Sequence, residues 1–429
     1  MLHHPPNHPQ RHAMADEVHA RPPQTVQGPA RASYLAVLVD AADRGRELEH
    51  LQALCRDAGI AVPPAEATHL QAGLGPLRLT WERHGEFSGY LMIAAGAAPQ
   101  PFAEPAVALM PPGWLAAVPG QAIAAVHVDV MADTGQPQDA AALARHFGGH
   151  GVAGARIADG AGAVFSDFRL HADGFSRWLV LDRALTPGQA GRTLQRLVEI
   201  EAYRLLALLA LPIARQQTPR MLQIERELAR LTESLAQGRG EDEALLHELT
   251  LLAAEVESSL AASQFRFGAC RAYFELVTRR IAELRESRLT GLQTVDEFMA
   301  RRFAPAMATC HTAEQRLHGL SERIARASAM LSTRVDITRE RQNQALLASM
   351  DRRARLQLRL QQTVEGLSVA AIVYYMAGLV GYLAKGIKAG GLRFEPDLIV
   401  AVAVPALALA AFFVVRRARR HAAERDGVH

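Results

Sequence analysis

Two apolar runs near the C-terminus dominate the pattern of hydrophobic positions along the chain. Residues 367–384 (LSVAAIVYYMAGLVGYLA) and residues 398–415 (LIVAVAVPALALAAFFVV) each extend for 18 residues without a charge. At about 1.5 Å rise per residue, a helix of this length spans about 27 Å, enough for a thin bilayer core. Since 13 residues join the runs, we expect a transmembrane hairpin over residues 364–415. Two buried core helices are the alternative, because 18 residues is the lower limit for a span.

The first part of the chain has the mixed pattern of an α+β domain. Residues 1–30 are rich in Pro, His and Gln, which predicts an irregular arm. Residues 31–186 then predict a cytosolic head of about six strands and two or three helices. The expected strands cover residues 33–39, 76–84, 87–95, 123–131, 164–170 and 175–182, and the expected helices cover residues 44–57 and 139–147.

From Thr186 onward the pattern is helical. Thr186 is suited to the N-cap and Pro187 to the first turn of a helix that we expect to end at Pro212. Farther along, apolar or small residues alternate three and four positions apart, which is a coiled-coil-like seam that Gly291 would break. The seam consists of Leu249, Leu252, Val256, Leu260, Ser263, Phe267, Cys270, Phe274, Val277, Ile281 and Leu284.

A further helix pattern continues without Pro or Gly from residue 320 to residue 365 and leads into the first apolar run. At about 1.5 Å per residue this segment measures roughly 70 Å. We therefore expect an N-terminal mixed α/β head, a long antiparallel helical stalk over residues 187–363, the hairpin, and a basic tail over residues 416–429.

The charges that flank the two apolar runs predict their orientation. Four arginines precede the first run, four follow the second, and the connecting loop holds three basic and two acidic residues. The arginines before the first run are Arg352, Arg353, Arg355 and Arg359, and those after the second are Arg416, Arg417, Arg419 and Arg420. The charged loop residues are Lys385, Lys388, Arg393, Glu395 and Asp397. The positive-inside rule then keeps both termini in the cytoplasm, as expected for a protein of the bacterial cytoplasmic (inner) membrane.

Overall charge and cysteine content narrow the range of functions. The net charge of +3 is too small for a nucleic-acid-binding protein, and the basic residues gather where anionic head groups would attract them. Three cysteines without a CxxC pair indicate reduced thiols. Neither a nucleotide-binding loop nor a hydrolase motif is present, so we expect no catalytic residues, no cofactor and no metal site.

Two clusters of polar residues are candidates for a ligand or partner surface. Carboxylates and imidazoles together can bind a divalent cation or transfer protons. Equally, the two clusters can pair with each other and pin the arm to the edge of the sheet. The first cluster is Glu17, His19 and Arg21 in the arm, and the second is Trp81, Glu82, Arg83, His84 and Glu86 at a turn between two strands.

Small and aromatic residues in the first apolar run suggest close helix packing. Ala377 and Gly381 are four residues apart, with Gly378 beside them, and such small-residue faces let helices approach closely. Tyr375 and Tyr382 lie on the same run. These five residues are candidates for packing within the hairpin, for contacts of a homo-oligomer or for the lining of a pore.

Several longer motifs resemble a bacterial family of predicted membrane-anchored proteins whose domain has no assigned function. The resemblance extends from about residue 7 to residue 388. It implies a membrane anchor and supplies no catalytic residues. The motifs are residues 16–23 (DEVHARPP), 81–87 (WERHGEF), 166–169 (SDFR), 191–204 (GRTLQRLVEIEAYR), 321–336 and 363–368 (TVEGLS).

The expected layout is also similar to that of CorA-type magnesium channels, which have a cytosolic head, a helical stalk and two C-terminal spans. Those channels end the first span with a Tyr-Gly-Met-Asn motif, whereas residues 381–386 here read GYLAKG. The basic loop would also repel a cation at a pore mouth. Our leading hypothesis is therefore a membrane-anchored, non-enzymatic homo-oligomer whose head binds a partner or ligand. A CorA-like channel is the alternative, and an enzyme that uses Glu17, His19, Trp81, Glu82 and His84 is a third hypothesis.

Overall fold

The computed structural model describes residues 5–12, 14–15, 24–135, 139–389 and 395–426. The chain is α+β and divides into two compact units, Met1–Ala329 and Met330–His429. Each unit is described by itself below. Glu17, His19 and Arg21 lie outside the described residues.

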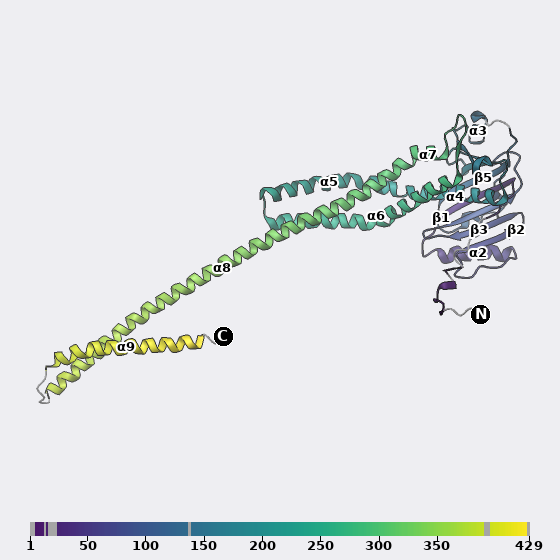
Figure 1. The fold of residues 1–429 in the computed structure, drawn as a ribbon. Coiled ribbons are helices and arrows are strands. Elements are labelled where there is room, and N and C mark those ends of the chain that lie inside the picture. The colour runs from purple at the N-terminus through teal and green to yellow at the C-terminus, as the bar shows by residue number, and fades with distance from the viewer. Residues whose placement is uncertain (1–4, 13, 16–23, 136–138, 390–394, 427–429) are drawn as a thin grey trace. The chain divides into compact units, whose positions relative to one another are not determined.

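A nine-stranded mixed sheet forms the centre of the first unit, as far as the described residues show (Figure 1). The strand order is β2-β3-β4-β1-β5-β8-β7-β6-β9. Neighbouring strands are antiparallel except for the parallel pair β5 and β8. The strands are β1 (Ala30–Leu38), β2 (His69–Leu74), β3 (Leu77–Arg83), β4 (Phe87–Ala95), β5 (Gln121–Ala132), β6 (Ala153–Ile157), β7 (Gly162–Ser166), β8 (Ser176–Asp182) and β9 (Ser287–Arg288).

Helices cover both faces of this sheet. Helix α2 (Arg44–Asp57) packs its buried Leu51 over β1, β3 and β4, and helix α3 (Ala140–His146) packs Leu143 over β7 and β8 on the same face. Helix α4 (Pro187–Leu208) covers the opposite face and buries Leu194 and Leu197. We call these the α2 face and the α4 face. On the α4 face the indole Nε1 of Trp178 donates a hydrogen bond to the buried carboxylate of Glu201 at 3.1 Å.

Elements with a strong periodic pattern have the bounds that the sequence predicts, and weakly patterned elements do not. Residues 44–57 and 87–95 form α2 and β4 as expected. The prediction of six strands was wrong because it omitted β2, β6 and β9. Strand β2 lies at the edge and is mostly exposed, β6 (AGARI) has small residues, and β9 has only two residues.

The helical breaks also differ from the prediction. Thr186 and Gln189 form a capping box at the start of α4, as Thr186-Pro187 predicted. Pro212, however, does not end a helix, since it lies in the first turn of α5 (Ala210–Gln237), where proline removes no hydrogen bond. Helix α6 (Asp242–Leu284) ends at Arg285 in the left-handed conformation, ahead of Gly291.

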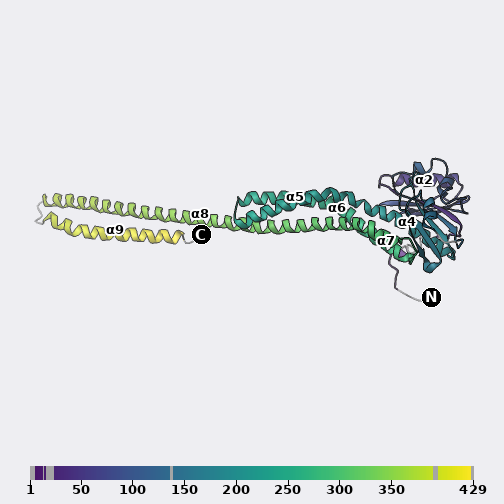
Figure 2. The same ribbon diagram turned by 90° about the horizontal axis from the view of Figure 1, so that it is seen from above.

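Helices α5 and α6 and the first part of α8 (Ala304–Ala389) lie side by side within the first unit (Figures 1 and 2). Arg316 of α8 binds Glu225 of α5 through two hydrogen bonds of 3.2 and 2.7 Å, and Arg271 of α6 binds Glu314 of α8. The predicted seam of α6 is buried at every position except Leu260 and Phe274, which are half-buried. Helix α7 (Val295–Arg302) connects α6 to α8.

The second unit consists of the remainder of α8 and of helix α9 (Pro396–Asp426), which form a hairpin (Figure 2). The two predicted apolar runs lie inside these helices. Within the described residues, these two helices are long and apolar enough to cross a membrane, and their apolar windows are 6% and 0% buried. Among the described residues of the second unit, neither apolar window forms a buried core.

Candidate functional site

The predicted Trp81–Glu86 cluster does not form one site, because alternation along β3 sends its members to opposite faces of the sheet. Trp81 lies in the core under α2, and Arg83 has its guanidinium 5.1 Å from the Trp81 ring centroid. Glu82 and His84 line a cavity on the α4 face. Glu86 lies in the turn beyond β3, where Arg266 of α6 binds it through two hydrogen bonds of 3.2 and 2.6 Å.

On the α2 face, the fully buried Glu47 of α2 holds three side chains of the sheet. Its Oε1 accepts hydrogen bonds from Trp81 Nε1 at 3.0 Å and from the Tyr90 hydroxyl at 2.6 Å, and Arg83 lies 3.9 Å from its Oε2. Burial, and then the charge of Glu47, raise the pKa of Tyr90 far above its ordinary value, so this hydroxyl remains a donor. These contacts join α2 to the sheet, which is a structural role for Trp81 and Arg83.

The cavity on the α4 face is small, and Glu82 and His84 line it. His84 Nε2 lies 3.8 Å from Glu82 Oε2, and the His84 ring stacks on Phe87 at 4.3 Å between centroids. The cavity volume of about 50 Å³ has room for little more than water. Burial raises the pKa of the neighbouring Tyr34 well above its ordinary value, with further increases from Tyr203, Glu199 and Glu82.

The described chain resumes after the arm at Gln24, which lines this same small cavity. The Gln24 side-chain amide donates to Thr80 Oγ1 at 2.8 Å, and Val26 N donates to the carbonyl oxygen of Pro187 at 3.0 Å. Residues 24–26 are thus fixed between β3 and the start of α4. The pairing predicted for Glu17, His19 and Arg21 falls on residues outside the described ranges and stays a prediction.

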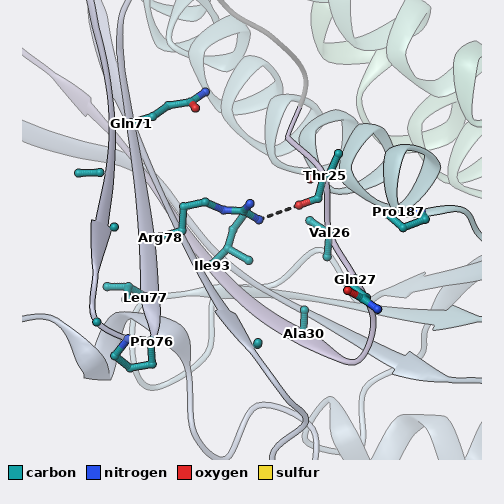
Figure 3. Close-up of a pocket in the computed structure, with 14 residues that line it drawn as sticks. Thr25, Val26, Gln27, Ala30, Gln71, Pro76, Leu77, Arg78, Ile93 and Pro187 are labelled. Carbon is teal, nitrogen blue, oxygen red and sulfur yellow. Dashed lines mark hydrogen bonds between the residues drawn. The ribbon is translucent and has the colours of Figure 1, made fainter.

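A larger cavity lies beside residues 24–30, between this segment and strands β2, β3 and β4 (Figure 3). Its volume of about 540 Å³ is in the range of small-molecule sites, which measure about 300–1,000 Å³. Arg78 supplies a cation, and one of its nitrogens donates to the Thr25 carbonyl oxygen at 2.7 Å. Gln71 and Gln27 supply amides, while Ile93 and Leu77 supply apolar surface. Neither Arg78 nor Gln71 stands out in the sequence, since each is one polar residue between apolar neighbours within a strand.

Another cluster that the sequence did not reveal joins three turns on the α2 face. Asp167 Oδ2 lies 2.9 Å from His150 Nδ1 and 3.2 Å from His171 Nε2. Asp167 is fully buried, His171 is 8% exposed and His150 is 37% exposed. One donor atom from each residue lies within 4.8 Å of the other two. In the sequence, the feature that could have indicated this cluster is a histidine in each of two glycine-containing turns, residues 148–151 and 171–174.

Another histidine on this face, His127, has structural contacts. The Ser33 hydroxyl oxygen accepts a hydrogen bond from Val107 N at 3.1 Å and shares a hydrogen bond of 2.9 Å with His127 Nδ1. The His127 ring stacks on Phe175 at 4.0 Å. Burial lowers the pKa of His127 to about 4, against a smaller opposing effect of Asp173.

In the second unit, the candidate residues of the first span divide into packing and exposed positions. A Cβ added to Gly381 would lie 3.3 Å from Val400 Cγ2 of α9, so Gly381 allows this close approach. An added Cβ on Gly378 would meet open space. Tyr375 and Tyr382 are 74% and 80% exposed, and Ala377 is half-buried.

Comparison with known proteins gives one match. The model of a family described as "Protein of unknown function (DUF3422)" matches residues 6–422, which is nearly the whole chain. No match was found among curated proteins or among solved structures.

Proposed function

The chain belongs to the DUF3422 family, and we propose that this member is a membrane-tethered binding protein. Its two C-terminal helices insert in the bacterial cytoplasmic membrane with both termini in the cytoplasm. The head binds a ligand or a protein partner, catalyses no reaction and uses no cofactor or nucleic acid. The molecule assembles as a homo-oligomer.

One observation is the main support for the membrane tether. The helices around residues 367–384 and 398–415 have apolar windows that are 6% and 0% buried, whereas the first unit buries a regular core. Leu, Ile, Val and Phe side chains that stay exposed over such lengths would be costly in water at about 25 cal/mol per Å². A bilayer removes that cost, and the arginines at positions 352–359 and 416–420 would meet its anionic head groups.

The cavity of Figure 3 supports ligand binding by the head. Several of the residues that line the cavity are small, so much of its surface is backbone. These residues are Ala30, Ala72, Gly73, Gly75 and Ala95. The Arg78 Nε atom is buried and has no hydrogen-bond partner among the described residues. A cation beside apolar surface and two amides suits a small anionic or polar molecule better than a purely apolar one.

The exposed tyrosines support self-association through the spans. Tyr375 and Tyr382 carry hydroxyl groups that would be unpaired in lipid, and contact with a second copy would satisfy them. The CorA-like channel is the competing function. A channel requires a ring of several chains. A dimer supplies only four spans, which are too few to enclose an ion pathway lined by Tyr375.

Light scattering on the detergent-solubilised protein, corrected for bound detergent, separates the two functions. We expect a protein mass of twice the 46.6 kDa chain and no Mg²⁺ flux into proteoliposomes. A ring of four or more chains together with Mg²⁺ flux would contradict the tether proposal and establish the channel. Tyr375→Phe and Tyr382→Phe together should shift the mass toward that of the monomer. Tyr374→Phe serves as the matched control, because Tyr374 is equally exposed but lies about 100° around the helix from Tyr375.

A further inference from the structure

The cluster of His150, Asp167 and His171 has the donor set of a metal centre. Two imidazole nitrogens, Nδ1 of His150 and Nε2 of His171, approach the same carboxylate oxygen, Asp167 Oδ2, at 2.9 and 3.2 Å. The other oxygen, Oδ1, accepts a hydrogen bond from Arg169 N at 3.2 Å, which fixes the plane of the carboxylate. Oriented ligands of this kind are typical of metal sites, where an outer hydrogen bond holds each ligand in place.

The backbone around Asp167 is built to present this side chain. Phe168 adopts φ of 56°, a left-handed conformation that is strained for a non-glycine residue. The Phe168 ring is held by Trp178 in an edge-on contact at 5.1 Å and by Phe298 in a stacked contact at 4.3 Å. Phe168 N also donates to Ser166 Oγ at 3.1 Å. Packing on the α4 face thus maintains a strained turn whose effect is to direct Asp167 toward the two histidines.

Both histidines come from turns that are closed by backbone hydrogen bonds. Gly148 and Gly149 have φ of 67° and 81°. Gly149 N donates to the Ala144 carbonyl oxygen, and His150 N donates to the carbonyl oxygen of the buried Phe147 at 3.3 Å. His171 N donates to the Phe175 carbonyl oxygen at 3.0 Å, and Gly174 N donates to the His171 carbonyl oxygen at 2.9 Å. The three donor atoms are therefore preorganised before any ion arrives.

We propose that His150 Nδ1, Asp167 Oδ2 and His171 Nε2 bind one divalent first-row transition-metal ion, with Zn²⁺ as the reference. Metal–ligand distances of about 2.0–2.2 Å place neighbouring donor atoms about 3.0–3.5 Å apart, and the two distances to Oδ2 lie at or near this range. Two imidazoles and one carboxylate favour such an ion over Mg²⁺ or Ca²⁺, which prefer oxygen ligands.

Three protein ligands leave at least one coordination position for water or for an oxygen of a bound molecule. His150, the most exposed of the three, lies on the side from which an ion can enter. The metal would be a ligand of the head separate from the cavity of Figure 3, and the inference does not depend on the membrane tether. A metal ion at these residues would contradict the expectation from the sequence that the chain has no metal site.

The test uses the full chain in detergent, stripped of metal with a chelator and then titrated with Co²⁺ and Zn²⁺. We expect the visible d–d absorption of Co²⁺ in a low-symmetry site, and about one equivalent of Zn²⁺ by calorimetry that displaces it. His171→Ala should weaken Zn²⁺ binding at this site at least 100-fold, and His150→Ala should do so with little effect on folding, because its side chain is partly exposed. Asp167→Asn keeps the shape of the buried side chain and should also abolish the Co²⁺ spectrum.

The N-terminal histidines are the main competing ligands, and the controls address them. Replacement of His3, His4, His8 and His12 by alanine should leave the Co²⁺ spectrum and the one equivalent of Zn²⁺ unchanged. Absence of Co²⁺ absorption in the wild type would overturn the proposal and leave a hydrogen-bonded triad. Retention of the spectrum by His150→Ala and His171→Ala, or its loss in the N-terminal variant, would overturn it as well.

Discussion

Replacement of Glu47 by alanine is expected to lower the free energy of unfolding of the first unit by about 3–5 kcal/mol. The reason is that Glu47 is fully buried and is the acceptor for both Trp81 Nε1 and the Tyr90 hydroxyl. Without it, two buried donors have no partner and the charge of Arg83 loses its nearest carboxylate. Urea unfolding followed by tryptophan fluorescence measures the change, since Trp81 lies at the site.

Two further variants of α2 identify the cause of this loss. Glu47→Gln keeps one acceptor oxygen and removes the charge, so its effect should be smaller than that of alanine. Glu49→Ala, on the exposed side of the same helix, controls for helix propensity and should change stability by less than about 0.5 kcal/mol. Equal stability of Glu47→Ala and Glu49→Ala would show that the buried network contributes nothing.

Gly191→Ala is expected to destabilise the first unit by about 3 kcal/mol and to release the segment that walls the cavity of Figure 3. A Cβ at position 191 would lie 1.7 Å from the Gln24 carbonyl oxygen and 2.6 Å from its carbon, so backbone must move. The movement would break the hydrogen bond from Val26 N to Pro187. Hydrogen exchange measured by mass spectrometry should therefore show faster exchange of the Val26 amide.

Gly188→Ala is the matched control for this variant. Gly188 lies on the same helix, and its added Cβ would meet only the end of the flexible Arg192 side chain, at 3.3 Å. Since alanine favours helix over glycine by up to about 1 kcal/mol, this control should be neutral or stabilising. If Gly191→Ala behaves like Gly188→Ala, with Val26 still protected, residues 24–26 do not pack on α4 as described.

The sequence pattern predicted the helices and strands that bury a regular face. It failed for elements that form only because of tertiary contacts. Helix α2 repeats leucines at positions 48, 51 and 54, and β4 is a mostly apolar run without a charge, so the sequence pattern predicts their bounds. Strand β9, by contrast, exists only because residues after α6 return to pair with β6. No local signal predicts such a strand.

The candidate sites illustrate the same limit. Residues 81–86 look like one cluster in the sequence, but alternation along β3 separates Trp81 and Arg83 from Glu82 and His84. The opposite holds for His150, Asp167 and His171, which come together only through the connection between β7 and β8 and the loop after α3. Spacing in the sequence carries little information when each ligand lies on a different turn.

The membrane tether is tested most directly by the accessibility of single cysteines. Cys55, Cys270 and Cys310 are all buried, so the native thiols should react slowly with a maleimide. Glu395→Cys places a thiol between the two spans, and Gln357→Cys places one ahead of the first. In intact spheroplasts a membrane-impermeant maleimide should label Glu395→Cys, while Gln357→Cys should be labelled only after permeabilisation. Labelling of both only after permeabilisation, with the protein in the soluble fraction, would contradict the tether.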